Sequence, residues 1–365
     1  MDEFILPVTV IKGRGAATRI AHRFEHVQRN AFDDGWGTWN VSTDGVGPSI
    51  ATQVIWEDAK SIITHNDSPD IYFDHSLNPY RGCEHGCVYC YARPTHSFLG
   101  LSPGLDFETK IIAKRNIATV LRAELAKPRY IPSLVAIGTA TDCYQPVERD
   151  LRLTRAVIEL FHETHHPFGL VTKSSAVERD MDLIAPMAAR HLATVYITIT
   201  TLDGDLARKL EPRAASPQRR LRTIRTLVAE GIPVGVSLAP QIPFLNEDME
   251  QVLDAAWDAG ARTAFYTVLR LPWELKEVFK EWLELHYPLR AARIMARIQD
   301  MRGGKDYDAD FATRMKGSGL WAELIRQRFM KATTRLGYNR ARHTPDLSLF
   351  RKPEPLGCEG QGSLF

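Results

Sequence analysis

The residues of this chain best suited to chemistry are three cysteines on one short segment, Cys83, Cys87 and Cys90. They lie in the run Tyr-Arg-Gly-Cys-Glu-His-Gly-Cys-Val-Tyr-Cys-Tyr, so their spacing is C-x3-C-x2-C. Thiolates this close in sequence can converge on one metal centre. An iron–sulfur cube usually takes four Cys ligands, and a set of three leaves one iron open to an outside molecule. The spacing therefore indicates an iron–sulfur cluster at which chemistry takes place.

Two other uses of clustered cysteines have to be considered. A structural zinc site closes a tetrahedron with four protein ligands, and the fourth ligand here would be His85, His96, Cys143 or Cys358. A disulfide framework is disfavoured, because the chain has 365 residues, only five cysteines and no secretory signal pattern. Free thiols around an oxidisable cluster fit a reducing compartment, so we expect a cytoplasmic protein.

Composition agrees with an enzyme that has a large buried core. Hydrophobic residues make up 44% of the chain, and no apolar run approaches the length of a membrane span. The formal net charge is +2, which is too small to indicate a partner.

The distribution of charge is more informative than its sum. From residue 301 to residue 352, twelve Lys or Arg stand against five Asp or Glu. Phe329 and Tyr338 lie among the basic residues Arg326, Arg328, Lys331, Arg335, Arg340 and Arg342. Basic residues with interleaved aromatic residues suit phosphate contacts and base stacking, although a solvated helix face has the same composition.

Strand and helix patterns alternate through the middle of the chain. Short apolar or β-branched runs occupy residues 134–137, 169–172, 193–199, 233–237 and 264–268, and helical patterns occupy residues 152–164, 219–230 and 249–258. Such alternation predicts parallel strands joined by helical crossovers. With a first strand before the cysteines, there are six units. They could form a doubly wound sheet or a partial barrel, in which functional residues gather on the loops after the strands.

The flanks have a different character and suggest four regions. Residues 1–73 look like an extension that wraps the central unit, which we place at 74–273. Residues 274–338 predict helices at 275–285, 289–301 and 310–328, and the tail 339–365 is rich in Pro, Gly and charge.

The run from Val8 to Thr18 begins like a dinucleotide-binding loop. Its third small residue is Thr18, however, and no strand–helix–strand unit follows, so we dismiss a nucleotide site.

The cysteine spacing, with Tyr89 before the last cysteine, closely resembles the radical S-adenosylmethionine (SAM) superfamily. Segments 87–91, 170–174 and 238–240 resemble its spore photoproduct lyase branch, often described as DNA repair photolyase-like, and segments 138–146 and 210–213 resemble an uncharacterised bacterial group within it. The resemblance implies an α/β fold, an incomplete (β/α)6 barrel with an N-terminal extension and a helical C-terminal extension. It also implies a [4Fe–4S] cluster whose open iron chelates SAM. One electron, usually from a flavodoxin or ferredoxin, would cleave SAM to methionine and a 5′-deoxyadenosyl radical.

The same resemblance implies a SAM site at the strand ends. Tyr91 should lie against the cofactor just past the cluster, and Thr141 stands where the lyase has a Ser near SAM. Lys173 matches a Lys that contacts the SAM carboxylate, a suitable role for a cation.

Three further residues belong to that expected site. Thr198 and Thr200, at the end of one strand, would offer hydroxyls to the ribose or methionine, and Ala239 would pack at the adenine. Threonines in strands also reflect simple β-propensity.

One departure from the lyase concerns its hydrogen donor. The lyase has a Cys in the segment where this chain has Thr139, and a hydroxyl cannot replace a thiol in hydrogen-atom transfer because its O–H bond is too strong. Cys143 and Tyr144 follow shortly after, and we predict them as a substitute donor pair. The alternative is that Cys143 is a small hydrophobic residue under a loop.

The carboxyl terminus suggests a protein partner. Gln361–Phe365 (Gln-Gly-Ser-Leu-Phe) and Asp346–Phe350 (Asp-Leu-Ser-Leu-Phe) resemble the peptides by which bacterial repair proteins bind the replication sliding clamp. In such a peptide, Leu and Phe enter an apolar pocket. Burial in this chain's own core is the alternative, and it suits the internal copy better.

Three function classes follow. The first is a radical SAM enzyme that acts on a nucleic acid, with a damaged or modified DNA base as its expected substrate. The second is a radical SAM enzyme for a small metabolite or peptide. The third is a zinc-binding nucleic-acid adaptor without enzymatic activity.

Overall fold

The computed structural model describes residues 8–25, 50–340 and 344–354, and its centre is a seven-stranded sheet. Six of the strands run parallel, in the spatial order β3 (His75–Leu77), β6 (Val135–Ile137), β7 (Phe168–Thr172), β8 (Ala193–Thr198), β9 (Val234–Gln241) and β10 (Thr263–Val268). The seventh, β2 (Ile63–His65), pairs antiparallel with β3 at one edge. This order confirms the predicted incomplete (β/α)6 barrel.

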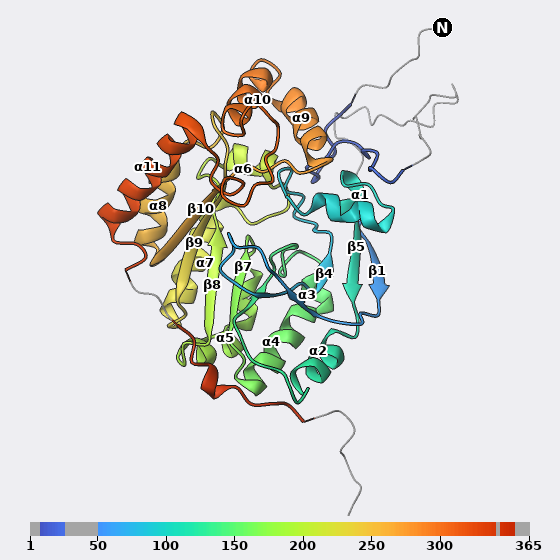
Figure 1. The fold of residues 1–365 in the computed structure, drawn as a ribbon, viewed down its shortest axis with the longest axis vertical. Coiled ribbons are helices and arrows are strands. Elements are labelled where there is room, and N and C mark those ends of the chain that lie inside the picture. Colours follow the sequence, from blue (N-terminus) through green and yellow to red (C-terminus); the bar gives the residue numbers. More distant parts are fainter. Residues whose placement is uncertain (1–7, 26–49, 341–343, 355–365) are drawn as a thin grey trace, which may run out of the picture.

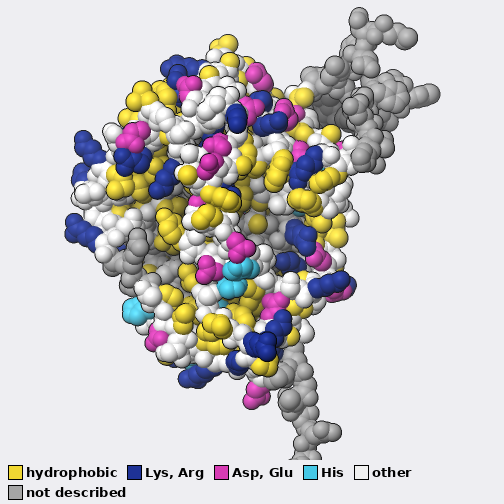
Figure 2. Space-filling view, viewed as in Figure 1, with side chains coloured by type: hydrophobic (Ala, Val, Ile, Leu, Met, Phe, Trp, Pro, Cys, Tyr) yellow, Lys and Arg dark blue, Asp and Glu magenta, His cyan; other side chains and the backbone are white. Residues whose placement is uncertain are grey.

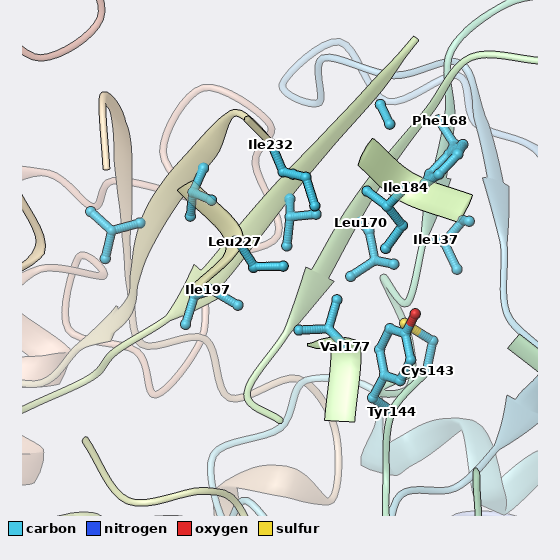
Figure 3. Close-up of a cluster of buried hydrophobic side chains, with 14 of the residues drawn as sticks. Ile137, Cys143, Tyr144, Phe168, Leu170, Val177, Ile184, Ile197, Leu227 and Ile232 are labelled. Atoms are coloured by element: carbon cyan, nitrogen blue, oxygen red, sulfur yellow. The ribbon is translucent and has the colours of Figure 1, made fainter. Parts of the chain in front are cut away.

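Helices cover one face of this sheet (Figure 1). They are α4 (Leu153–Thr164), α5 (Met181–Ala188), α7 (Pro217–Ala229) and α8 (Met249–Asp258). Helix α7 begins after Ser216, whose side chain accepts a hydrogen bond from the backbone N–H of Arg219, and Pro217 fits the first turn. Strand residues that point to this face, such as Leu170 and Ile197, are fully buried against the helices (Figure 3).

A second, three-stranded sheet lies beside the barrel in the order β1 (Gln53–Glu57), β5 (Lys110–Lys114) and β4 (Tyr80–Arg81). Strands β1 and β2 belong to the segment that we expected only to wrap the barrel. Neither was predicted from sequence, because β2 has three residues and β1 is partly exposed on both faces. Such strands lack the two-residue alternation that marks a half-buried strand.

Short helical elements fill the connections between these strands. They are η1 (Arg93–Leu99), α1 (Leu105–Thr109), α2 (Ile117–Leu125), α3 (Glu148–Leu151), η2 (Ser175–Asp180), α6 (Gly204–Leu210) and η3 (Leu347–Leu349). Elements η1, α1, β5 and α2 are inserted between the cysteines and β6, so the first crossover is the most elaborate one. None of the helices in the described residues is both long and apolar enough to cross a membrane.

The C-terminal extension holds α9 (Leu275–His286), α10 (Ala291–Asp300) and α11 (Gly319–Leu336). The first two confirm the predicted helices, whereas the third, predicted at 310–328, begins and ends later in the chain. Gly317 and Gly319 adopt φ values of +74° and +79°, which interrupt a helix, and α11 begins only at Gly319. It packs on α8 and β10 and widens the covered side of the sheet.

The basic run on α11 does not form the predicted stacking surface. Phe329 is buried with its ring 4.7 Å from that of Tyr266, and Tyr338 is buried with its hydroxyl bonded to a backbone carbonyl. Arg328 pairs with Glu250 and Arg335 with Asp254, so carboxylates offset much of the charge. Arg342 lies outside the described residues. Basic and acidic side chains are also interspersed over the face shown in Figure 2.

The structure describes one of the two segments that resemble clamp-binding peptides. In the internal one, Leu349 and Phe350 pack on the main core, and the Phe350 ring lies 5.6 Å from the ring of Tyr130. Burial, the alternative considered for this copy, therefore describes it. The terminal copy at 361–365 lies outside the described residues.

Candidate active site

The three cysteines lie on the cysteine loop, defined here as residues 82–92, between β4 and η1. Cys83 and Cys87 are buried, Cys90 is partly exposed, and all three are free thiols. Backbone hydrogen bonds fold the loop tightly, from Gly86 to Cys83, from Cys90 to Cys87 and from Arg93 to Cys90. Burial, and to a lesser degree Asp142, Cys87 and Cys90, raises the pKa of the Cys83 thiol.

A buried ion pair holds the cysteine loop in place. Arg93 and Glu108 are both fully buried, and their side chains meet at 2.5 Å. Arg93 also donates to the carbonyl of Cys87 at 2.9 Å and of Gly86 at 3.0 Å. Because one planar cation binds two carbonyls of the loop, the spacing between Cys87 and its neighbours is fixed by a group outside the motif.

The N-terminal segment completes this anchor. Glu108 accepts hydrogen bonds from the backbone N–H groups of Gly15 and Ala16, both at 2.9 Å. A Cβ atom on Gly15 would lie 1.9 Å from the carbonyl oxygen of Gly86. The segment that superficially resembles a dinucleotide loop therefore packs closely against the cysteine loop.

This close approach gives a testable prediction. We expect Gly15→Ala to lower the free energy of unfolding by about 1–3 kcal/mol, because the added methyl must displace the backbone of Gly86. Urea unfolding measures this loss. The matched control is Gly204→Ala at the first position of α6, where a Cβ meets nothing within 4 Å and stability should hold. Equal stability of both variants would contradict the contact.

Asp142 joins the loop to the ends of β6 and β7. Its carboxylate accepts hydrogen bonds from the Thr172 hydroxyl and the Lys173 backbone N–H, both at 2.7 Å, and lies 3.2 Å from Nδ1 of His85. Burial alone would disfavour the charged form, but His85 and these donors hold the pKa of Asp142 well below its usual range. The backbone around Lys173 is thus fixed relative to the cysteines.

Glu211 forms a second link, between the loop and β8. It accepts hydrogen bonds from the hydroxyls of Tyr89 and Thr200 and pairs with Arg220, which is also buried. Arg220 donates in turn to the backbone carbonyl of Thr198 at 2.9 Å. Although burial opposes ionisation, Arg220 and Lys173 lower the pKa of Glu211. The hydroxyl of Thr200 therefore donates to Glu211, which leaves its oxygen available as an acceptor.

Lys173 is the best placed of the predicted SAM residues. Its Nζ lies 5.8 Å from the centre of the Tyr89 ring, and its ammonium has no hydrogen bond to any described residue. Burial lowers the pKa of this ammonium, but Cys87, Glu211 and Asp142 outweigh burial and raise it. The structure thus holds a charged, unpaired lysine beside Cys87.

The other predicted SAM residues lie around the same end of the sheet. Tyr91 is 44% exposed, and its hydroxyl donates to the carbonyl of Thr139. Thr141 is buried with its hydroxyl 3.4 Å from the carbonyl of Tyr80. Thr198 is buried at the end of β8 and Ala239 is partly exposed near the end of β9. The carboxyl ends of parallel strands meet at one edge, as the prediction requires.

Cys143 and Tyr144 follow β6 at this edge, but their side chains lie in the core. Cys143 is completely buried in the main core, and the Tyr144 hydroxyl donates to Asp180 at 2.9 Å. Figure 3 shows both beside Val177, in the layer that the helices cover. Asp142 accepts from the backbone N–H of Tyr144 in a local turn, and it is the next residue, Gln145, that hydrogen-bonds to Gly82 and Glu84 of the cysteine loop. This placement does not support the predicted donor pair.

The donors proposed for a zinc site are engaged elsewhere. His85 faces Asp142, Nε2 of His96 lies 3.0 Å from the carbonyl of Lys110, and Cys143 is in the core. Among the residues described, no three His, Cys, Asp or Glu side chains converge as the ligands of one ion. Cys358 falls outside that part of the chain. Cys83, Cys87 and Cys90 are among the side chains that do not converge in this way, so it is their residue type and close spacing that fit an iron–sulfur cube with one open position.

Sequence comparison identifies a family for this region. Residues 77–256 match the family described as the radical SAM superfamily. An uncharacterized protein of Mycobacterium tuberculosis is 36% identical over 224 residues, which cover 60% of this chain and 66% of that protein, slightly less than two thirds of its length. An uncharacterized protein of Methanocaldococcus jannaschii is 29% identical over 212 residues, which cover 58% and 76%.

Solved structures show the same fold. A variant of spore photoproduct lyase with bound AdoMet and dinucleoside spore photoproduct matches with a TM-score of 0.53 and 14% identity, over 78% of this chain and 80% of that one. Another variant of the lyase matches with a TM-score of 0.52 and 15% identity over the same shares. At this identity, the likeness shows a common architecture.

Proposed function

This chain carries a radical SAM domain, and from that premise we propose that it is an enzyme that abstracts hydrogen from a base of a nucleic acid, with a damaged or modified DNA base as the substrate. The observation that carries the proposal is the cysteine loop itself. Three free thiols lie there close together in sequence, and the ammonium of Lys173 lies 5.8 Å from the ring of Tyr89 on the same loop.

The residues at the site have distinct tasks in this proposal. Cys83, Cys87 and Cys90 would hold a [4Fe–4S] cluster, which supplies the electron that cleaves SAM to methionine and a 5′-deoxyadenosyl radical. Lys173 would bind the carboxylate of SAM through a charge-assisted hydrogen bond. Ala239, with its small side chain, leaves room for the adenine ring. A flavodoxin or ferredoxin would deliver the electron.

Two observations support a nucleic acid as the substrate. The lyase variant of the same fold is described with a dinucleoside photoproduct. In this chain, the guanidinium of Arg270 lies 4.3 Å above the Tyr91 ring and has no ion pair or hydrogen bond within the described residues. A partly exposed arginine of this kind suits a phosphate. A base in duplex DNA would have to leave the stack to reach the site.

The proposal is tested with ultraviolet-irradiated DNA. The anaerobically reconstituted protein is incubated with SAM, a reductant and the DNA, and the bases are then analysed by mass spectrometry. We expect a base whose mass changes only when SAM is present. Formation of 5′-deoxyadenosine with no change in any base, together with no salt-dependent DNA binding, would contradict the proposal and favour a small metabolite or peptide.

The role of Lys173 gives a separate prediction. We expect Lys173→Ala to weaken SAM binding at least about tenfold, because hydrogen bonds to charged groups contribute about 1.5–3 kcal/mol. Anaerobic titration calorimetry measures the affinity, and visible absorbance shows whether the cluster is retained. Lys352→Ala is the matched control, since that exposed ammonium binds only the carbonyl of Pro128. An unchanged affinity for SAM in Lys173→Ala would remove this residue from the site.

A further inference from the structure

Two aromatic rings meet on the inner face of the sheet, opposite the face that the helices cover. Tyr196 belongs to β8 and Phe265 to β10, and their ring centres are 5.4 Å apart at an angle of 60°. Phe265 is 38% exposed, whereas its neighbours Ala264 and Tyr266 on the same strand are buried toward the helices. The alternation of the strand therefore places a large, partly exposed apolar ring on the face opposite α7 and α8.

Strand β9 is built so that these rings can touch. It lies between β8 and β10, and Gly235 is in register with both Tyr196 and Thr263. A Cβ atom at Gly235 would lie 2.3 Å from Cε1 of Tyr196 and 2.4 Å from Oγ1 of Thr263. The bare backbone of Gly235 thus allows the Tyr196 ring to cross β9 and reach Phe265.

Polar groups border the two rings. Thr198 and Ser237 are in register with each other, and Ser237 with Phe265, so all three stand at one level of the inner face. The hydroxyl of Tyr196 has no hydrogen bond to any residue that the structure describes. Thr198 and Ser237 are themselves buried, so the polar group offered beside the two rings is the Tyr196 hydroxyl. A partly exposed aromatic ring beside a hydroxyl suits a flat ring that carries hydrogen-bonding groups.

We propose that Tyr196 and Phe265 form a stacking subsite for a nucleobase of the substrate. The base would lie against the Phe265 ring, with Tyr196 closing one side. The subsite begins one residue pair nearer the amino ends of the strands than Thr200 and Ala239, so it is separate from the positions expected for the SAM adenine. The inference rests on the proposed function, because it assigns the base of a nucleic-acid substrate.

The test compares two single strands of about eight nucleotides, which is within the usual site size for such strands. One is fluorescein-labelled oligothymidylate, and the other has the same backbone without bases. Anisotropy titrations use the reconstituted protein. We expect the unchanged protein to prefer the strand with bases, and Phe265→Ala to reduce that preference by about tenfold while keeping the weaker backbone binding. Phe265→Leu should fall equally, since stacking needs an aromatic face.

Control variants distinguish an absent stacking subsite from an incorrect proposed function. Trp56→Ala removes a ring of similar exposure from β1 of the three-stranded sheet, and this variant should keep the preference for the strand with bases. Retained preference in Phe265→Ala would overturn the subsite and leave the proposed function standing. Binding of neither strand by the unchanged protein would overturn both. Weaker SAM binding in Phe265→Ala, with oligonucleotide binding intact, would assign the corner to the cofactor and likewise overturn the subsite.

Discussion

Replacing Cys83, Cys87 or Cys90 by Ala is expected to remove the iron–sulfur cluster and, with it, all SAM cleavage. The cysteine loop carries three free thiols, and in the proposed cluster each of them binds one iron, so no spare ligand could replace a lost one. Loss of a residue that merely supports a ligand costs about 10–100-fold in metal affinity, so loss of a ligand itself should cost more. Iron and sulfide analysis after anaerobic reconstitution measures the effect.

Cys143→Ala is the matched control for these variants. Its thiol lies in the main core beside Gly138, where Tyr144 and Val177 also pack. We expect full iron and sulfide content and a loss of about 1 kcal/mol in the free energy of unfolding. A Cys143 variant without iron would show that this thiol is a ligand and would contradict the site described above.

Arg93→Met is expected to cause the largest loss of stability. The change leaves the carboxylate of Glu108 fully buried without its counter-charge and removes a donor from the carbonyls of Gly86 and Cys87. Breaking a buried pair in this way costs about 3–5 kcal/mol, a large share of the stability of a typical domain. Urea unfolding measures this loss, and reconstitution should also give less cluster, because the cysteine loop has lost its anchor.

Two further variants identify the cause. The double variant Arg93→Met with Glu108→Gln should recover part of the lost stability, since no charge is then left unpaired. Arg115→Met breaks the exposed pair with Asp58 and should leave unfolding nearly unchanged. A loss in Arg115→Met as large as that in Arg93→Met would show that burial of the pair is not the cause.

The central strands were predictable because each has a continuous apolar signature. The run at 193–199 is buried on the helix side through Val195, Ile197 and Ile199, and β-branched residues favour strands. Strands β1 and β2 are short or half exposed, so no pattern marks them. The start of α11 was missed because two glycines, at 317 and 319, interrupt an otherwise helical composition.

Within the site, only the ligands had a sequence signal. Three cysteines at fixed spacing indicate a cluster without any knowledge of the fold. The residues that hold the cysteine loop in place have no such signal, because they are far apart in sequence. Glu108 bonds to Ala16 across 92 residues, and Tyr89 bonds to Glu211 across 122. Glu211 stood in a segment whose resemblance had been noted, but its partner Arg220 follows at no characteristic spacing. Such pairs are defined only by packing.

For the predicted donor pair, position in the sequence suggested a role that the directions of the side chains do not support. Cys143 and Tyr144 follow a strand at its carboxyl end, where functional residues gather in barrels. The side chain of Asp142 and the hydroxyl of Thr154, which bonds the Cys143 carbonyl at 2.5 Å, turn this segment toward the helices. Position along a strand predicted the right edge of the sheet, but the local hydrogen bonds set the direction of the side chains.

The most direct test of the account is the formation of 5′-deoxyadenosine. The protein is purified without oxygen, reconstituted with iron and sulfide, and reduced in the presence of SAM. We predict 5′-deoxyadenosine from the unchanged protein and none from the variant in which all three cysteines of the loop are replaced by Ala. A protein that binds zinc in place of a cluster and never cleaves SAM would contradict the account.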